Sequence, residues 1–144
     1  MKYALAFASL PLFILPAFSS VMTLSYDTVY DDGATSLDRV ACSNGNNGLV
    51  TRGYTTFASL PSYPYICGIE FVKGWNSPNC GTCYNVTYGN PGEKKTFSIL
   101  AVDTDPNGMN IGENVMNKMT NGNAVEYGTV EADVEQVAES YCGL

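Results

Sequence analysis

The sequence TFSILAVD, residues Thr96–Asp103, is the clearest buried strand in the chain. Its continuous apolar run is typical of a strand whose side chains pack inside a hydrophobic core. The run ends in a carboxylate, Asp103, which is followed by a polar loop. This stretch therefore predicts both the centre of the fold and a polar group at the point where the central strand leaves the core.

Shorter segments with strand character lie on both sides of this stretch. The strands that we expect are Met22–Tyr30, Gly68–Val72, Tyr84–Tyr88 and Thr129–Val137, and most are bounded by Gly, Asn or Pro. A helix is expected over Ile111–Met119, where Ile111, Val115, Met116 and Met119 recur at helical spacing. Six or so short strands with one clear helix and one core indicate a small, closed β-barrel.

Composition excludes several function classes. The chain has 144 residues, 45% of them hydrophobic, and a formal net charge of -7, so it forms one folded domain and is expected to bind no nucleic acid. It contains no His, which removes the Ser-His-Asp triad and every His-containing zinc site. Because phosphate-binding and dinucleotide-binding glycine motifs are also absent, no metal or cofactor is expected.

Residues 1–20 have the pattern of a secretory signal peptide. Lys2 precedes a mostly apolar run that is interrupted by Pro11 and Pro16 and ends in small residues at Ser19 and Ser20. A membrane span needs about 20 apolar residues without such breaks, so we expect no span. The predicted product is a secreted, extracellular domain over residues 21–144.

The five cysteines, Cys42, Cys67, Cys80, Cys83 and Cys142, all lie in this domain. In an oxidising compartment they are expected to form two bridges and leave one cysteine over, in an arrangement that spacing alone does not decide. The pair in CGTC, Cys80 and Cys83, resembles a redox dithiol. A secreted chain without a surrounding βαβ pattern favours structural bridges instead.

The combined motifs resemble those of the cerato-platanin family of small secreted fungal proteins. The matching segments are SYDTVY at 25–30, VACSNG at 40–45, GWNSPNCGTC at 74–83, the strand ending in Val102 and Asp103, and the late Cys142. The resemblance covers nearly the whole predicted mature chain, and the order and spacing of the segments together are specific.

The resemblance implies a six-stranded double-psi β-barrel with one or two short helices, related in shape to the first domain of expansins. It also implies two disulfides, Cys42–Cys80 and Cys83–Cys142. Cys67 is then the odd cysteine. It is expected to be either a buried free thiol or the partner in an intermolecular disulfide.

Candidate site residues follow from the chemistry of carbohydrate binding. Such sites combine short polar side chains with an aromatic platform. Asp103 is the leading candidate, with the alternative that it only satisfies its own turn. Trp75 could stack on a sugar, but core packing is the favoured interpretation. The glycan-binding set that we predict is Asp103, Tyr26, Asp27, Ser43, Asn44, Gly45 and Asn110.

The leading hypothesis is a non-catalytic protein that binds N-acetylglucosamine oligomers (chitin oligomers) or another cell-wall polysaccharide. The resemblance adds expansin-like wall loosening, elicitation of host defence through a host receptor, and association with the cell wall. A weak glycoside hydrolase needs a second carboxylate besides Asp103, and a surface-active, self-assembling protein is the third hypothesis. The sequon at Asn85–Thr87 lies in an expected strand, so its glycosylation is left open.

Overall fold

The computed structural model describes residues 19–144. Most of the predicted signal peptide, residues 1–18, lies outside the described residues, and Ser19 and Ser20 begin the first strand. None of the helices within residues 19–144 has the length and apolar character that a bilayer crossing requires.

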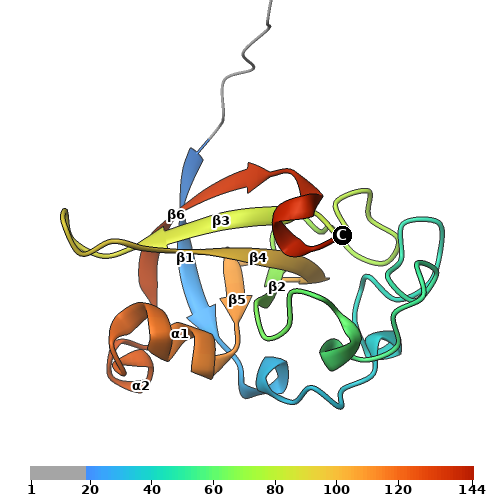
Figure 1. The fold of residues 1–144 in the computed structure, drawn as a ribbon, viewed down its shortest axis with the longest axis horizontal. Coiled ribbons are helices and arrows are strands. Elements are labelled where there is room, and N and C mark those ends of the chain that lie inside the picture. The colour runs from blue at the N-terminus through green and yellow to red at the C-terminus, as the bar shows by residue number, and fades with distance from the viewer. Residues whose placement is uncertain (1–18) are drawn as a thin grey trace, which may run out of the picture.

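Six strands close into a barrel (Figure 1). They are β1 (Ser19–Tyr26), β2 (Ile66–Ile69), β3 (Cys83–Tyr88), β4 (Lys95–Thr104), β5 (Met109–Ile111) and β6 (Val130–Val137), and their order around the barrel is β1-β5-β2-β4-β3-β6. Two neighbouring pairs are parallel, β1 with β5 and β2 with β4. Two short helices, α1 (Glu113–Thr120) and α2 (Ala124–Tyr127), join β5 to β6. The expected six-stranded double-psi β-barrel with short helices is confirmed.

Three predicted elements have wrong bounds by two residues or more. β1 ends at Tyr26 because Asp27 Oδ1 accepts the amide of Val29 at 2.9 Å and caps a 3₁₀ helix over Thr28–Asp31. Ile111 belongs to β5 and not to the helix, which begins after Gly112. β2 covers Ile66–Ile69 rather than Gly68–Val72, because the chain turns at Ile69, whose carbonyl accepts the amide of Val72.

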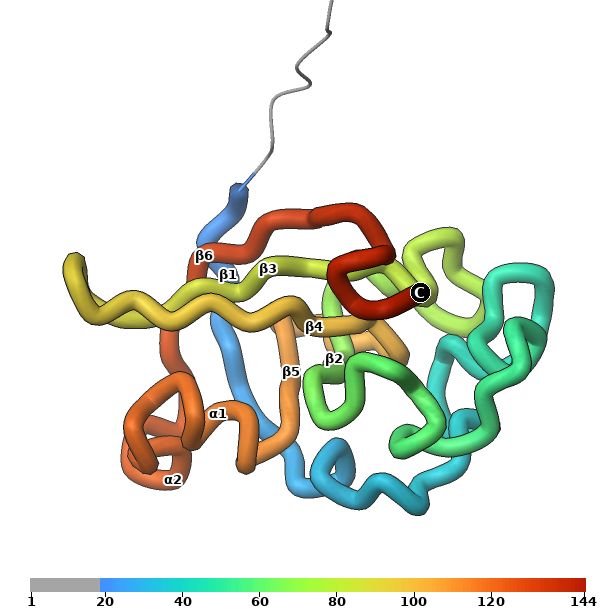
Figure 2. The backbone as a smooth tube through the Cα atoms, viewed as in Figure 1, coloured from blue at the N-terminus to red at the C-terminus, as the bar shows by residue number. Residues whose placement is uncertain are grey.

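A long segment between β1 and β2 passes over the outside of the barrel (Figure 2). This segment contains little regular structure, yet Leu37, Leu49 and Phe57 are fully buried. Backbone hydrogen bonds hold it together, including Leu37 N–H to Thr55 O at 2.9 Å. The hydrophobic core therefore lies partly inside the barrel and partly between the barrel wall and this segment.

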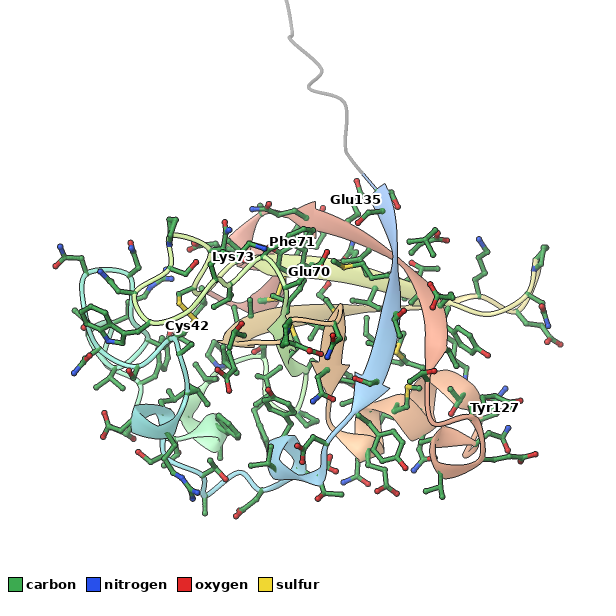
Figure 3. The ribbon with its side chains drawn as sticks, turned by 180° about the vertical axis from the view of Figure 1, so that it is seen from behind. Cys42, Glu70, Phe71, Lys73, Tyr127 and Glu135 are labelled. Carbon is green, nitrogen blue, oxygen red and sulfur yellow. A yellow bond between two sulfur atoms is a disulfide. The ribbon has the colours of Figure 1, made fainter. Side chains whose placement is uncertain are left out.

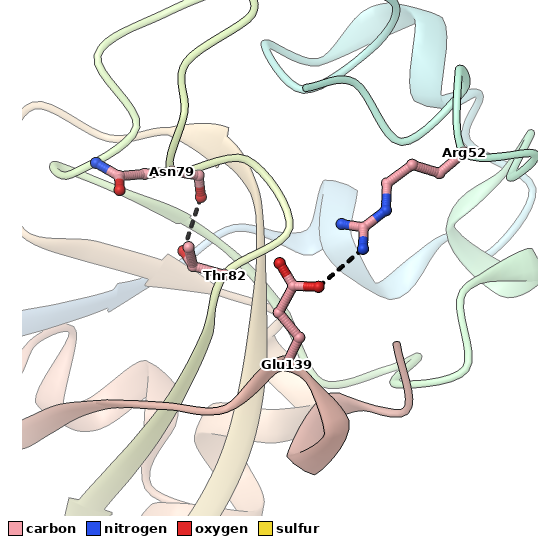
Figure 4. Close-up of polar contacts among 4 residues, drawn as sticks. All are labelled: Arg52, Asn79, Thr82 and Glu139. Atoms are coloured by element: carbon pink, nitrogen blue, oxygen red, sulfur yellow. Dashed lines mark hydrogen bonds and ion pairs between the residues drawn. The ribbon is translucent and has the colours of Figure 1, made fainter. Parts of the chain in front are cut away.

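Both expected disulfides, Cys42–Cys80 and Cys83–Cys142, are present. The two cysteines of CGTC thus bridge to distant parts of the chain, and the redox interpretation is excluded. Between them, Gly81 lies against Arg52, whose guanidinium forms an ion pair with Glu139 at 2.8 Å (Figure 4). Thr82 Oγ1 donates to the Asn79 carbonyl at 2.7 Å in the same region. The loop that carries Arg52, the turn between Cys80 and Cys83, and the C-terminal segment at Glu139 are thereby held together.

Cys67 is unpaired and fully buried in β2. Burial raises the pKa of its thiol, and the negative charges of Asp105 and Asp103 raise it further. A neutral, enclosed thiol packs as a small apolar group. Of the two expectations for the odd cysteine, the structure has the buried free thiol, and its sulfur is not accessible to a second chain.

The disulfides are expected to contribute strongly to stability. The Cys42–Cys80 bridge closes a loop with a sequence separation of 38, and the Cys83–Cys142 bridge closes one of 59. In the chain-entropy model each bridge contributes about 4 kcal/mol. The double variant Cys42→Ser/Cys80→Ser should lose about that much unfolding free energy in urea denaturation. A loss below about 1 kcal/mol would contradict the model.

Stability should also fall at alkaline pH. The folded protein keeps the Cys67 proton to higher pH than the unfolded chain does, where the thiol pKa is 9.0. The contribution of the Cys67 thiol to the free energy of unfolding is therefore fully present below pH 9. Above pH 9 this contribution decreases by about 1.4 kcal/mol per pH unit. In urea denaturation between pH 9.5 and 10.5, wild type should lose stability more steeply than Cys67→Ala by about this amount. Equal slopes for the two proteins would show that the thiol does not contribute.

Candidate functional site

A β-bulge sets the direction of Asp103. Along the β2–β4 pair, Cys67 lies opposite Ala101, but the next residue, Gly68, lies opposite Asp103. Val102 is the extra residue, and its carbonyl accepts the amide of Cys42 at 3.1 Å. Bulges redirect side chains in this way. Without the bulge, Gly68 would lie opposite Val102, and Asp103 would lie opposite Ile69.

Asp103 belongs to a row of residues that crosses four strands. Asp103 on β4 pairs with Gly68 on β2, Gly68 pairs with Asn110 on β5, and Asn110 pairs with Ser25 on β1. Ser25 Oγ lies 3.3 Å from Asn110 Oδ1. Their neighbours along the strands, Leu24, Ile69, Met109 and Ile111, are fully buried in the core. Because strand side chains alternate between faces, the row lies on the outer wall of the barrel.

Tyr30 covers the middle of this row. A Cβ at Gly68 would lie 2.7 Å from the Tyr30 hydroxyl, so only glycine leaves room for the ring. Tyr30 is 5% exposed, stacks on Phe57, and its hydroxyl has no hydrogen-bond partner among residues 19–144. Burial raises the pKa of Tyr30, and the Asp103 carboxylate raises it further. The hydroxyl therefore stays protonated and keeps its proton as a hydrogen-bond donor.

Among the described residues, only one of the two oxygens of the Asp103 carboxylate is hydrogen-bonded. Its Oδ1 accepts the amide of Ala41 at 2.9 Å and that of Thr104 at 2.8 Å. Its Oδ2 has no partner within the described part of the chain, and the residue is half-buried. The carboxylate thus satisfies its own turn, as the alternative interpretation held, and keeps one oxygen available to a ligand.

The loop after Cys42 lies beside this carboxylate because the amides of Ala41 and Cys42 both bond to the end of β4. Ser43 is buried, whereas Asn44 is exposed. Gly45 has a φ of 85°, and a Cβ there would lie 2.6 Å from Asn76 Oδ1. The Asn76 side chain also accepts the amide of Asn47 at 2.9 Å. The predicted residues Ser43, Asn44 and Gly45 therefore belong to a rigid loop near Asp103.

Trp75 is not part of the core, contrary to the favoured sequence interpretation. Its side chain is 63% exposed, and its Nε1 donates to Asn44 Oδ1 at 2.7 Å. Trp75 belongs to a tight loop, where Gly74 has a φ of 147° and Asn76 one of 57°. Figure 3 shows Lys73, two residues before Trp75, on the same side of the barrel as Cys42 and far from Tyr127.

The other predicted site residues have different surroundings. Asn110 lies in the outer row with Asp103. Asp27 is exposed and caps the helix that carries Tyr30. Tyr26 pairs with Ile111 and packs against the core, so it does not share the outer row. Tyr30 was missed because the alternating pattern of residues 22–30 indicated one continuous strand.

The described residues offer little for metal or acid–base chemistry. Within residues 19–144, no group of three or more Cys, Asp or Glu side chains is arranged to hold a metal ion. Asp27 and Asp105, the other two carboxylates whose charge acts on Tyr30, each use Oδ1 to accept a nearby backbone amide.

The sequon residue Asn85 lies in the middle of β3, which pairs with β4 and β6. Its side-chain oxygen accepts a hydrogen bond from Ser98 at 2.7 Å.

The hydrogen bond from Trp75 to Asn44 can be tested by time-resolved fluorescence anisotropy, since the chain has one Trp. Asn44→Ala removes the acceptor of the indole N–H and should increase the local motion of the ring, while the stability changes by less than about 1 kcal/mol because both groups are exposed. Asn46→Ala, an exposed position in the same loop, is the matched control. If both variants behave like wild type, the loop does not fix Trp75.

Comparison with known proteins agrees with the resemblance seen in the sequence. A family model described as Cerato-platanin matches residues 22–144. The chain is 43% identical over its whole length to the heat-stable 19 kDa antigen of Coccidioides immitis, of which it covers 99%. It is 36% identical to the cerato-platanin of Ceratocystis fimbriata f. sp. platani, with 90% of this chain and 93% of that protein covered.

Two solved structures are similar to this chain in fold over most of its length. The crystal structure of cerato-platanin 2 from M. perniciosa superposes with a TM-score of 0.83 at 40% identity, covering 87% of this chain and all of that one. The solution structure of the fungal elicitor Cerato-Platanin has a TM-score of 0.72 at 35% identity, covering 84% of this chain and 96% of that one. The chain belongs to the cerato-platanin family.

Proposed function

We propose that this protein is a secreted, non-catalytic glycan-binding protein whose site combines Asp103, Tyr30 and Trp75. The ligand is an oligomer of N-acetylglucosamine or a related uncharged wall polysaccharide. Expansin-like loosening of the wall and elicitation of host defence would follow from this binding, and one relative of known structure is described as a fungal elicitor.

One observation carries the proposal. The exposed indole of Trp75 is held by Asn44, and the loop that carries Asn44 is held to the end of β4 by Asp103 Oδ1 and the Val102 carbonyl. An aromatic face and a carboxylate are thereby anchored to one rigid loop. Sugar sites use an aromatic ring for the apolar face of a pyranose and fixed polar groups for its hydroxyls.

The polar groups supply complementary hydrogen bonds. Asp103 Oδ2 can accept from a sugar hydroxyl or from an acetamide N–H, and such a bond to a charged group is stronger than a neutral one. The protonated Tyr30 hydroxyl can donate to a sugar oxygen. Since both groups have unused hydrogen-bonding capacity in the free protein, binding a glycan would satisfy them without breaking internal bonds.

The test is a titration with the N-acetylglucosamine tetramer, followed by Trp fluorescence and calorimetry. Asp103→Asn keeps an oxygen that can accept the amide of Ala41 but removes the charge. It should raise the dissociation constant about tenfold, since hydrogen bonds to charged groups contribute about 1.5–3 kcal/mol. Asp133→Asn on the exposed face of β6 is the matched control and should bind like wild type.

Two results would contradict the proposal. One is binding of the tetramer that Asp103→Asn and Trp75→Ala leave unchanged. The other is release of soluble reducing ends from wall polymer that is lost in Asp103→Asn, which would instead support the weak-hydrolase hypothesis.

A further inference from the structure

A hollow lies on the outer wall of the barrel, at the start of β4. Its volume is about 570 Å³, within the range of small-molecule sites. It is bounded by the loop at residues 61–65, by Thr96, Phe97 and Ser98 of β4, and by the C-terminal turn at residues 140–143. Ser98 and Asp103 are five residues apart on one strand, about 17 Å at 3.3 Å per residue, so the two sites are separate.

Aromatic rings form much of this hollow, and two of its three tyrosines, Tyr65 and Tyr63, are fixed by neighbouring groups. Tyr65 stacks on Phe97 with ring centroids 5.3 Å apart and an interplanar angle of 14°. Lys118 Nζ lies 5.1 Å from the centre of the Tyr65 ring and donates to its hydroxyl at 3.3 Å. The Tyr63 hydroxyl donates to the carbonyl of Asp31 at 2.6 Å. The third tyrosine, Tyr141, is 65% exposed at the edge.

Ser62 gives the hollow an unused polar group. Ser62 is 8% exposed, and its Oγ is wholly buried with no hydrogen-bond partner among residues 19–144. Leaving such a hydroxyl unsatisfied is energetically unfavourable. Ser62 lines the hollow, and rotation about its χ1 between staggered positions can turn the hydroxyl toward a molecule bound there.

The lining favours a neutral ligand with many hydroxyl groups. Its polar side chains are the hydroxyls of Ser62, Thr96, Ser98, Ser140 and the tyrosines, and it contains no Asp, Glu, Lys or Arg. The lining residues offer a charged ligand no counter-charge beyond the Lys118 ammonium on Tyr65, and a wholly apolar ligand would leave the hydroxyls unpaired. A pyranose ring presents an apolar face to tyrosine and hydroxyl groups to serine and threonine.

We infer that this hollow is a second carbohydrate site, which binds one or two neutral pyranose units of a glycan chain. The inference rests on the proposed function for the source of the sugar, whereas the binding contacts come from the hollow itself. Two separate sites on one small barrel would let the protein contact two neighbouring chains of a wall polymer, and avidity would then exceed the affinity of either site.

The test is an amide chemical-shift titration of the ¹⁵N-labelled protein with the N-acetylglucosamine tetramer. In wild type, two sets of amides should shift: one around residues 41–44 and 103, the other at residues 62–65, 96–98 and 140–143. Tyr141→Ala and Ser62→Ala should each raise the dissociation constant of the second set at least fivefold and leave the first set unchanged. Tyr127→Ala, an exposed tyrosine on α2, is the matched control and should alter neither set.

Folding of the variants is checked by thermal denaturation. Ser62→Ala removes an unpartnered hydroxyl, so its Tm should equal or exceed that of wild type.

The inference is overturned if the second set of amides does not shift, or if neither variant weakens the shifts of that set. Asp103→Asn separates the two proposals, because it should abolish only the first set. A silent first set with an intact second set would overturn the Asp103 site and leave the second site standing.

Discussion

The attachment of the Cys42 segment to the end of β4 is the constraint on which the rest of the structure depends. The amide of Cys42 bonds to the carbonyl of Val102, the amide of Ala41 bonds to Asp103, and the disulfide to Cys80 locks the same point. The hydrogen bonds need the bulge at Val102, which turns that carbonyl out of the β2–β4 ladder. One local irregularity therefore fixes the covering segment, the direction of Asp103 and the loop that holds Trp75.

The disulfides explain how so much irregular chain can be ordered. Segment 27–65 has few backbone bonds to the sheet, and its ordering costs conformational entropy that short 3₁₀ turns do not offset. The Cys42–Cys80 bridge restricts this segment in the unfolded chain, while Cys83–Cys142 does the same for the C-terminus. A small barrel can thus present long, rigid loops, which is the property that a binding protein needs.

The two proposed sites use the same wall of the barrel in different ways. At the end of β4, a carboxylate and a buried tyrosine hydroxyl are combined with an exposed indole. At the start of β4, hydroxyls and stacked rings form a neutral hollow. β4 is held on both sides by β2 and β3, so the relative position of the two sites does not depend on flexible segments.

The central strand, the barrel class, the family and, through the resemblance, both disulfide pairs could be predicted from the residues alone. Strand patterns and cysteine motifs are local, so they can be identified without knowing the fold. The register could not be predicted, because a bulge leaves no periodic signal: in the folded barrel Asp103 lies opposite Gly68 and in line with Asn110. Contacts between distant loops also decided that Tyr30 covers Gly68, that Trp75 is exposed and that Tyr26 packs against the core. Such contacts depend on which surfaces meet after folding, and no residue pattern within one segment encodes them.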